Sequence, residues 1–133
     1  WLGEEYDYVT FIEKDLTSVF ESLVSTLSED EQSELSLANS RARLRMTMLY
    51  QLASIHGGIV VGTGNRVEDF GVGFYTKYGD GGVDISPIAD LTKTEVREIA
   101  GYLGVDEEIK IYNKHHTQNK HKMIPIPVFK VKR

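Results

Sequence analysis

Apolar and polar positions divide the first part of the chain into a strand, a short helix and a long helix. Residues 6–16 alternate loosely and are rich in β-prone side chains, which predicts a strand. Asp15 precedes an apolar stretch with helical spacing, where its carboxylate can accept the first free backbone N–H groups of a helix. After an acidic loop at 28–33, the pattern predicts a long helix from about Glu34 to His56, which Gly57 ends in the left-handed conformation.

The long helix carries apolar residues and two arginines on the same face. The apolar residues that fall within this arc are Leu37, Leu44, Met48, Leu52 and Ile55. Arg41 and Arg45 fall inside the arc, whereas Arg43 projects to the opposite, more polar side. Because an unpaired buried guanidinium is costly, Arg41 and Arg45 should pair with carboxylates or cross a subunit boundary. The helix is therefore a candidate dimer interface.

A second strand and a third helix complete the pattern. The apolar run at 59–62 is typical of a strand that is buried on both faces of a parallel sheet. Strand, helix and strand in this order favour an α/β layer fold, in which ligands bind beyond the carboxyl ends of the strands. Further on, Thr92 and Glu95 have the spacing of a capping box, and an apolar stripe with helical spacing follows as far as Gly104.

The segment at 59–87 concentrates the residue types that a ligand site needs. Its glycines, which permit positive φ and close approach of the backbone to a ligand, stand at positions 62, 64, 71, 73, 79, 81 and 82. Acidic residues and a lysine lie between them, in a stretch too irregular to be core. We therefore expect the chemistry of the protein to lie in this segment.

The composition is that of one compact globular domain. The chain has 133 residues, of which 41% are hydrophobic, and it has no cysteine. The lack of cysteine excludes disulfides and thiolate metal sites and fits a cytoplasmic location. There is no run of about 18 apolar residues and no signal-peptide pattern, so we expect neither membrane insertion nor secretion.

Charge is distributed unevenly within a net charge of −5. Residues 110–133 carry seven Lys or Arg and no Asp or Glu, so they form a basic C-terminal tail. Such a tail can meet a nucleic acid, a phosphorylated ligand or the acidic body of the protein, or it can simply be solvated.

Three stretches of the sequence together resemble the NAD synthetases, most of all the ammonia-dependent bacterial enzymes. They are NSRARLRM at 39–46, VVGTGNRVEDFGVGFYTKYGDGGVDISPIADLTKTEVREIA at 60–100 and NKHKMIPIP at 119–127. The resemblance implies a Rossmann-like parallel sheet flanked by helices, as in the ATP-pyrophosphatase family. It also implies a single synthetase domain over 1–133 and a cytoplasmic homodimer whose active sites draw on both subunits.

The resemblance implies a ligase of NAD biosynthesis that works in two steps. ATP adenylates the nicotinate carboxylate of deamido-NAD with release of pyrophosphate, and ammonia then displaces AMP to give the amide of NAD. Mg²⁺ assists the first step. The expected partners are therefore deamido-NAD, ATP and ammonia, with no nucleic acid and no membrane.

Individual site residues follow from the same resemblance. It assigns ATP to Thr63 and Lys93, and the metal ion to Glu68. It assigns deamido-NAD to Arg43, Lys77, Asp84, His121 and Lys122. One glutamate beside a nucleotide is chemically sufficient for Mg²⁺, and a lysine at a helix N-terminus is better explained by an anionic ligand than by helix stability. No residue is assigned as a general base, because the attacking carboxylate is already ionised at neutral pH.

The sequence departs from the family pattern in two places. The family opens with a strand and an SGGxDS loop that grips the pyrophosphate of ATP, and residues 1–133 contain no such motif. The loop that follows the helix ending at Gly104 in the family is absent as well. We therefore expect the domain to be incomplete, without its N-terminal phosphate-loop portion and with a segment omitted near the junction 109/110.

Three other hypotheses remain open. The chain could be the synthetase portion of a glutamine-dependent NAD synthetase. It could also be a non-catalytic dinucleotide-binding module, if the phosphate loop is truly absent. A nucleic-acid binder that uses the basic tail is disfavoured, because no aromatic residues apart from Tyr112 and Phe129 are interleaved for base stacking.

Overall fold

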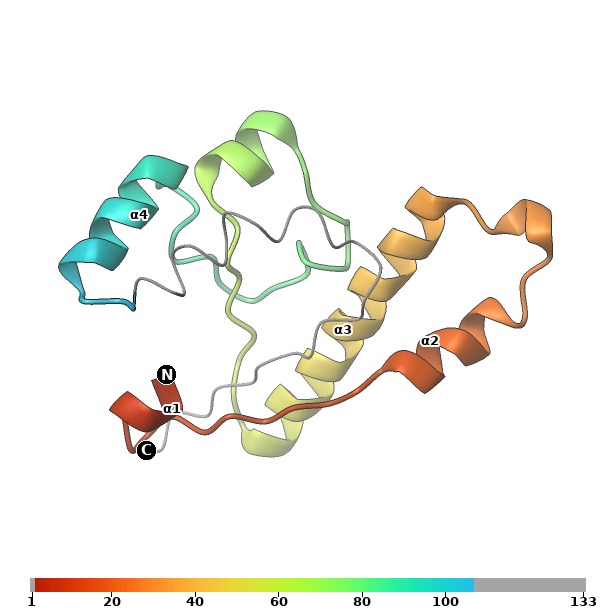
Figure 1. The fold of residues 1–133 in the computed structure, drawn as a ribbon, viewed down its shortest axis with the longest axis horizontal. Helices are drawn as coiled ribbons and strands as arrows, with labels where there is room; N and C mark the ends of the chain where they lie inside the picture. The colour runs from red at the N-terminus through yellow and green to blue at the C-terminus, as the bar shows by residue number, and fades with distance from the viewer. Residues whose placement is uncertain (1, 107–133) are drawn as a thin grey trace.

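The computed structural model describes residues 2–106, and its regular elements are helical (Figure 1). The elements are α1 (Leu2–Glu5), α2 (Thr17–Val24), the 3₁₀-helix η1 (Glu29–Glu31), α3 (Glu34–His56), the π-helix η2 (Arg66–Val72) and α4 (Lys93–Tyr102). Helices α2 and α3 pack against each other. No helix within residues 2–106 is long and apolar enough to cross a membrane.

The predicted bounds of α3 are confirmed, and local caps set both of its ends. Ser33 accepts a hydrogen bond from the backbone N–H of Ser36, and Gly57 adopts the left-handed conformation with φ of 61°. Leu52 is buried on the predicted face. Ile55 was predicted to share that burial, but 66% of its surface is exposed. It lies in the last turn of α3, where Ser54 and His56 are exposed as well.

The two arginines on the apolar face of α3 differ in how far they meet the prediction of a carboxylate partner. The guanidinium of Arg41 lies 4.3 Å from the ring centroid of Phe20 on α2, so an aromatic face takes the place of the expected carboxylate. Arg45 is half-buried, and burial together with the positive charge of Arg41 lowers its pKa, against the attraction of Asp80. Packing between α2 and α3 thus involves Arg41, and the proposed dimer interface stays a prediction.

Neither of the two predicted strands is present as a full strand. Residues 6–16 are not a strand: they run from α1 to α2 without a partner strand in the part of the chain that the structure describes. The strand expected at 59–62 is reduced to one parallel bridge between Val61 and Ile85. Val60 is buried but Val61 is exposed, so this segment is not buried on both faces.

The parallel bridge nonetheless fixes where the glycine-rich segment begins. The N–H of Gly62 donates to the carbonyl of Ile85 at 2.7 Å, and the N–H of Asp84 donates to the carbonyl of Val60 at 2.9 Å. The chain leaves the bridge through Gly62 and enters η2. The two ends of the glycine-rich segment are therefore held side by side.

Candidate functional site

The chain that leaves the bridge is organised by Asn65, which begins η2. Asn65 is only 5% exposed, and its side-chain oxygen accepts hydrogen bonds from the N–H groups of Val67 and Glu68, both at 3.1 Å. The π-helix η2 ends at Gly73, which has φ of 68°. π-helical turns are rare and frequently occur at functional sites. Asn65 thus fixes the position of Glu68 in the first turn of η2.

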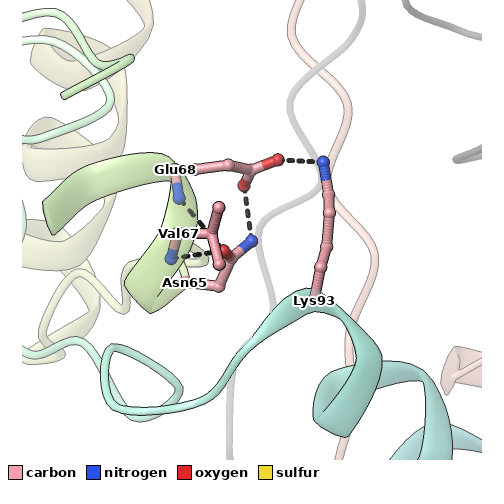
Figure 2. A network of polar contacts seen from close by, with 4 residues as sticks. All are labelled: Asn65, Val67, Glu68 and Lys93. Atoms are coloured by element: carbon pink, nitrogen blue, oxygen red, sulfur yellow. Dashed lines mark hydrogen bonds and ion pairs between the residues drawn. The ribbon is translucent and has the colours of Figure 1, made fainter. Parts of the chain in front are cut away.

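Glu68 stands between Asn65 and Lys93 (Figure 2). Its Oε2 accepts a hydrogen bond from Nδ2 of Asn65 at 2.7 Å, and its Oε1 forms an ion pair with the ammonium of Lys93. The side chains of Glu68 and Lys93 are 37% and 53% exposed. The structure therefore brings the predicted metal ligand and a predicted ATP ligand into direct contact, although they come from η2 and α4.

Lys93 reaches Glu68 because Thr92 fixes the start of α4. The predicted capping box is present: the Thr92 hydroxyl accepts from the N–H of Glu95 at 3.3 Å, and Oε2 of Glu95 accepts from the N–H of Thr92 at 2.6 Å. Lys93 is the first residue of α4, where a cation opposes the helix dipole. Its ion pair with Glu68 supplies an anion at this position.

Sequence reasoning missed Asn65, although a signal for it was present. Asn65 is followed three residues later by Glu68, which is the spacing of a capping box. The same spacing identified Thr92 and Glu95. An asparagine in this position after a glycine turn predicts a helix start, and the carboxylate three residues on then lies within reach of it.

Three residues predicted to bind deamido-NAD lie around the turn at 76–84. Arg43 is exposed on the polar side of α3, as predicted, and its Nε donates to the backbone carbonyl of Lys77 at 3.3 Å. The ammonium of Lys77 lies 5.1 Å from the ring centroid of Tyr78. Tyr78 has φ of 60°, a strained conformation for a residue other than glycine. The structure thus links Arg43 and Lys77.

Asp84 connects α3 to the bridge segment. Its Oδ1 accepts from the hydroxyl of Tyr50 at 3.1 Å, and its Oδ2 accepts from the N–H of Val60 at 2.7 Å. Both carboxylate oxygens of Asp84 therefore hold parts of the fold together, and its role as a ligand of deamido-NAD stays a prediction. Thr63, the other predicted ATP ligand, is exposed on the turn after the bridge. His121, Lys122 and the 109/110 junction lie outside the described residues.

The carboxylate of Asp69 packs against the backbone of Gly64, where a Cβ would overlap it. Burial raises the pKa of Asp69, and the negative charges of Asp80 and Glu68 raise it further. Since the pKa is higher in the folded state, the folded protein binds more protons between the unfolded and folded pKa values. This carboxylate therefore lowers stability progressively as pH rises through that interval.

The substitution Asp69→Asn should remove this loss of stability while keeping the side-chain shape. We expect the variant to be more stable than the wild type at neutral pH, with a difference that disappears as pH falls below about 4. Thermal unfolding midpoints of both proteins between about pH 3.5 and pH 7 would measure it. Asp90→Asn, on an exposed turn, is the control. If the unfolding midpoints of Asp69→Asn and the wild type differ by the same amount at every pH, the raised pKa of Asp69 is contradicted.

Residues 2–106 thus form a helical structure with one parallel bridge, and the candidate ligand site lies beyond the end of that bridge. The chain belongs to the NAD synthase family, whose model matches residues 5–121. The family resemblance is thereby confirmed.

Similar proteins include an NH3-dependent NAD(+) synthetase from Carboxydothermus hydrogenoformans, 49% identical over 102 residues that cover 74% of this chain and 42% of the relative. The solved NH3-dependent NAD synthetase of Campylobacter jejuni matches with a TM-score of 0.68 and 31% identity, over 74% of this chain and 42% of that one. The NMN synthetase of Francisella tularensis matches with a TM-score of 0.65 and 35% identity, over 71% and 39%. The chain thus spans less than half the length of each.

Proposed function

We propose that the protein converts deamido-NAD, ATP and ammonia to NAD, AMP and pyrophosphate. The observation that carries this proposal is the contact between Glu68 and Lys93 beside the glycine turn, because it joins the carboxylate proposed for the metal ion to the ammonium proposed for a phosphate group. Membership of the NAD synthase family supports the choice of reaction. The parallel bridge of Val61 and Ile85 supports a Rossmann-like sheet, and we propose a cytoplasmic homodimer.

Glu68 is the residue that we propose for Mg²⁺. Within residues 2–106 no group of three or more acidic or histidine side chains could hold a metal ion by itself. Mg²⁺ is usually bound by one or two carboxylates with phosphate oxygens and waters, so Glu68 fits the ion once a nucleotide is present. Its Oε1 already holds a cation, the ammonium of Lys93. When bound, Mg²⁺ would neutralise the charge that develops on the departing pyrophosphate.

Lys93 and Thr63 form the ATP half of the proposed site. Lys93 carries a compact positive charge for a phosphate group, and Thr63 offers a hydroxyl on the turn that follows the bridge. In the structure the charge of Lys93 is balanced by Glu68. With nucleotide and metal bound, Lys93 would pair with a phosphate group and Glu68 would hold the metal ion, in place of their ion pair with each other.

Arg43, Lys77 and Asp84 form the deamido-NAD half, with His121 and Lys122 proposed from the tail. A carboxylate oxygen of deamido-NAD attacks the α-phosphorus of ATP, and the bond to the pyrophosphate oxygen breaks. Ammonia then attacks the carbonyl carbon, the C–O bond to AMP breaks, and the nitrogen loses a proton. The protein contributes position and charge, which is sufficient because the carboxylate needs no base.

Product analysis of the full-length protein tests this proposal. With deamido-NAD, ATP and ammonium, we expect NAD and AMP to form in equal amounts. ADP as the nucleotide product would contradict the reaction. Turnover with glutamine but not ammonium would assign the chain to a glutamine-dependent enzyme, and turnover of nicotinate mononucleotide instead of deamido-NAD would change the substrate. Binding of deamido-NAD without turnover would favour a non-catalytic module.

A further inference from the structure

Glu68 is held by a residue that has no predicted role of its own. We propose that Asn65 is a positioning residue, which orients the Glu68 carboxylate toward its cation. This proposal rests on the metal-binding role proposed for Glu68. Asn65 is the one buried polar residue among residues 2–106, and it hydrogen-bonds the carboxylate directly at 2.7 Å.

The hydrogen bonds of Asn65 determine which way its amide faces. The side-chain oxygen accepts from the N–H groups of Val67 and Glu68, which only an oxygen can do. The amide nitrogen must therefore point to the other side, where Oε2 of Glu68 accepts from it. The start of η2 and the orientation of the carboxylate are thus set by one side chain (Figure 2).

This arrangement divides the two oxygens of Glu68 between the protein and a cation. Oε2 is held by Asn65, so Oε1 is the oxygen that faces the ammonium of Lys93. A carboxylate presented through one oxygen suits an ion with a compact octahedral shell such as Mg²⁺. Residues that orient a metal ligand in this way typically change metal affinity or activity by about 10- to 100-fold when they are lost.

Asn65 could alternatively serve only as the cap of η2, and glycine separates the two roles. Glycine is tolerated at a cap position far better than alanine, but it has no side chain that could donate to a carboxylate. Asn65→Gly should therefore keep most of the stability of the helix start and lose the bond to Glu68, whereas Asn65→Ala should lose both. Ser33→Ala is the matched control, because Ser33 caps α3 through the N–H of Ser36 and does not contact Glu68.

The experiment measures binding of Mn²⁺, with α,β-methylene ATP present, together with the thermal unfolding midpoint of the full-length protein. We expect Asn65→Gly to keep a midpoint close to that of the wild type and to bind Mn²⁺ about 10- to 100-fold more weakly. Asn65→Ala should show the same loss of Mn²⁺ affinity and should also unfold at a lower temperature. Ser33→Ala should unfold at a lower temperature with unchanged Mn²⁺ affinity.

Wild-type Mn²⁺ affinity in Asn65→Gly would overturn the proposal and leave Asn65 as a cap alone. In a Glu68→Gln background Asn65→Gly should cause no further loss, and a further loss of the same size would also overturn it. If the Asn65 variants do not fold, the Asn65 amide NMR signal of the wild type decides: it should shift on Mg²⁺-ATP binding, and an unchanged signal would contradict positioning. Loss of Mn²⁺ affinity in Asn65→Gly without any NAD formation by the wild type would refute the proposed reaction and leave the role of Asn65 standing.

Discussion

Replacing Glu68 by glutamine should lower the rate of AMP formation by at least about 100-fold, because metal neutralisation of a departing pyrophosphate contributes several kcal/mol. Glutamine keeps the length of the side chain and an oxygen that can accept from Asn65, but it cannot supply the negative charge. The rate of AMP formation from deamido-NAD and ATP at saturating Mg²⁺ would measure the effect. Loss of a half-exposed ion pair should cost at most about 1 kcal/mol of stability, so the variant should remain folded.

Glu98→Gln is the matched control for this substitution. Glu98 is an exposed glutamate on α4, so its replacement makes the same chemical change away from the Glu68 carboxylate. We expect wild-type rates in this variant. Wild-type turnover in Glu68→Gln would remove Glu68 from the site and with it the proposed metal position.

Replacing Lys93 by methionine should lower the affinity for ATP and raise the affinity for Mn²⁺. Hydrogen bonds to charged groups contribute about 1.5–3 kcal/mol, so affinity for ATP should fall by about 10- to 100-fold. Affinity for Mn²⁺ in the absence of nucleotide should rise, because Oε1 of Glu68 is no longer occupied by the ammonium. Calorimetric titration with α,β-methylene ATP and with Mn²⁺, each alone, would measure both effects.

Arg97→Met provides the comparison, because Arg97 is an exposed cation one turn further along α4. It should leave both affinities close to those of the wild type. If Lys93→Met leaves the affinity for ATP unchanged, Lys93 only balances the charge of Glu68. If Lys93→Met weakens the binding of both ATP and Mn²⁺, the proposed exchange of ion partners at Lys93 and Glu68 is wrong.

The elements that the sequence predicted correctly are those whose signals are local. Ser33 and Gly57 bound α3, and Thr92 with Glu95 begins α4, through hydrogen bonds within a few residues. Strand formation depends instead on a partner elsewhere in the chain. The β-prone residues at 6–16 have no such partner among residues 2–106, and Val61 pairs only through a single bridge.

The burial of side chains also depends on contacts with distant segments, so the sequence predicted it only in part. The helical arc grouped Leu52 with Ile55 as one buried face, but only Leu52 is buried, because an arc cannot indicate which part of a face another segment covers. It likewise placed Arg41 on that face without revealing that the ring of Phe20 lies beneath it.

For the candidate site, motif resemblance supplied the residue types and the structure supplied their contacts. Glu68 and Lys93 are far apart in sequence, and no periodicity predicts that η2 and the start of α4 meet. The contact between Arg43 and the carbonyl of Lys77 is of the same kind. Asn65 differs, since its spacing from Glu68 carries a local signal that a capping analysis would find.

Transfer of an oxygen atom from deamido-NAD to AMP tests the central claim most directly. Deamido-NAD labelled with ¹⁸O in its nicotinate carboxylate would be incubated with ATP and ammonium, and AMP and pyrophosphate would be examined by mass spectrometry. Because the carboxylate attacks the α-phosphorus and ammonia displaces AMP at carbon, one ¹⁸O atom should appear in each AMP. AMP without the label, or label in pyrophosphate, would contradict an adenylated carboxylate and the reaction proposed for this protein.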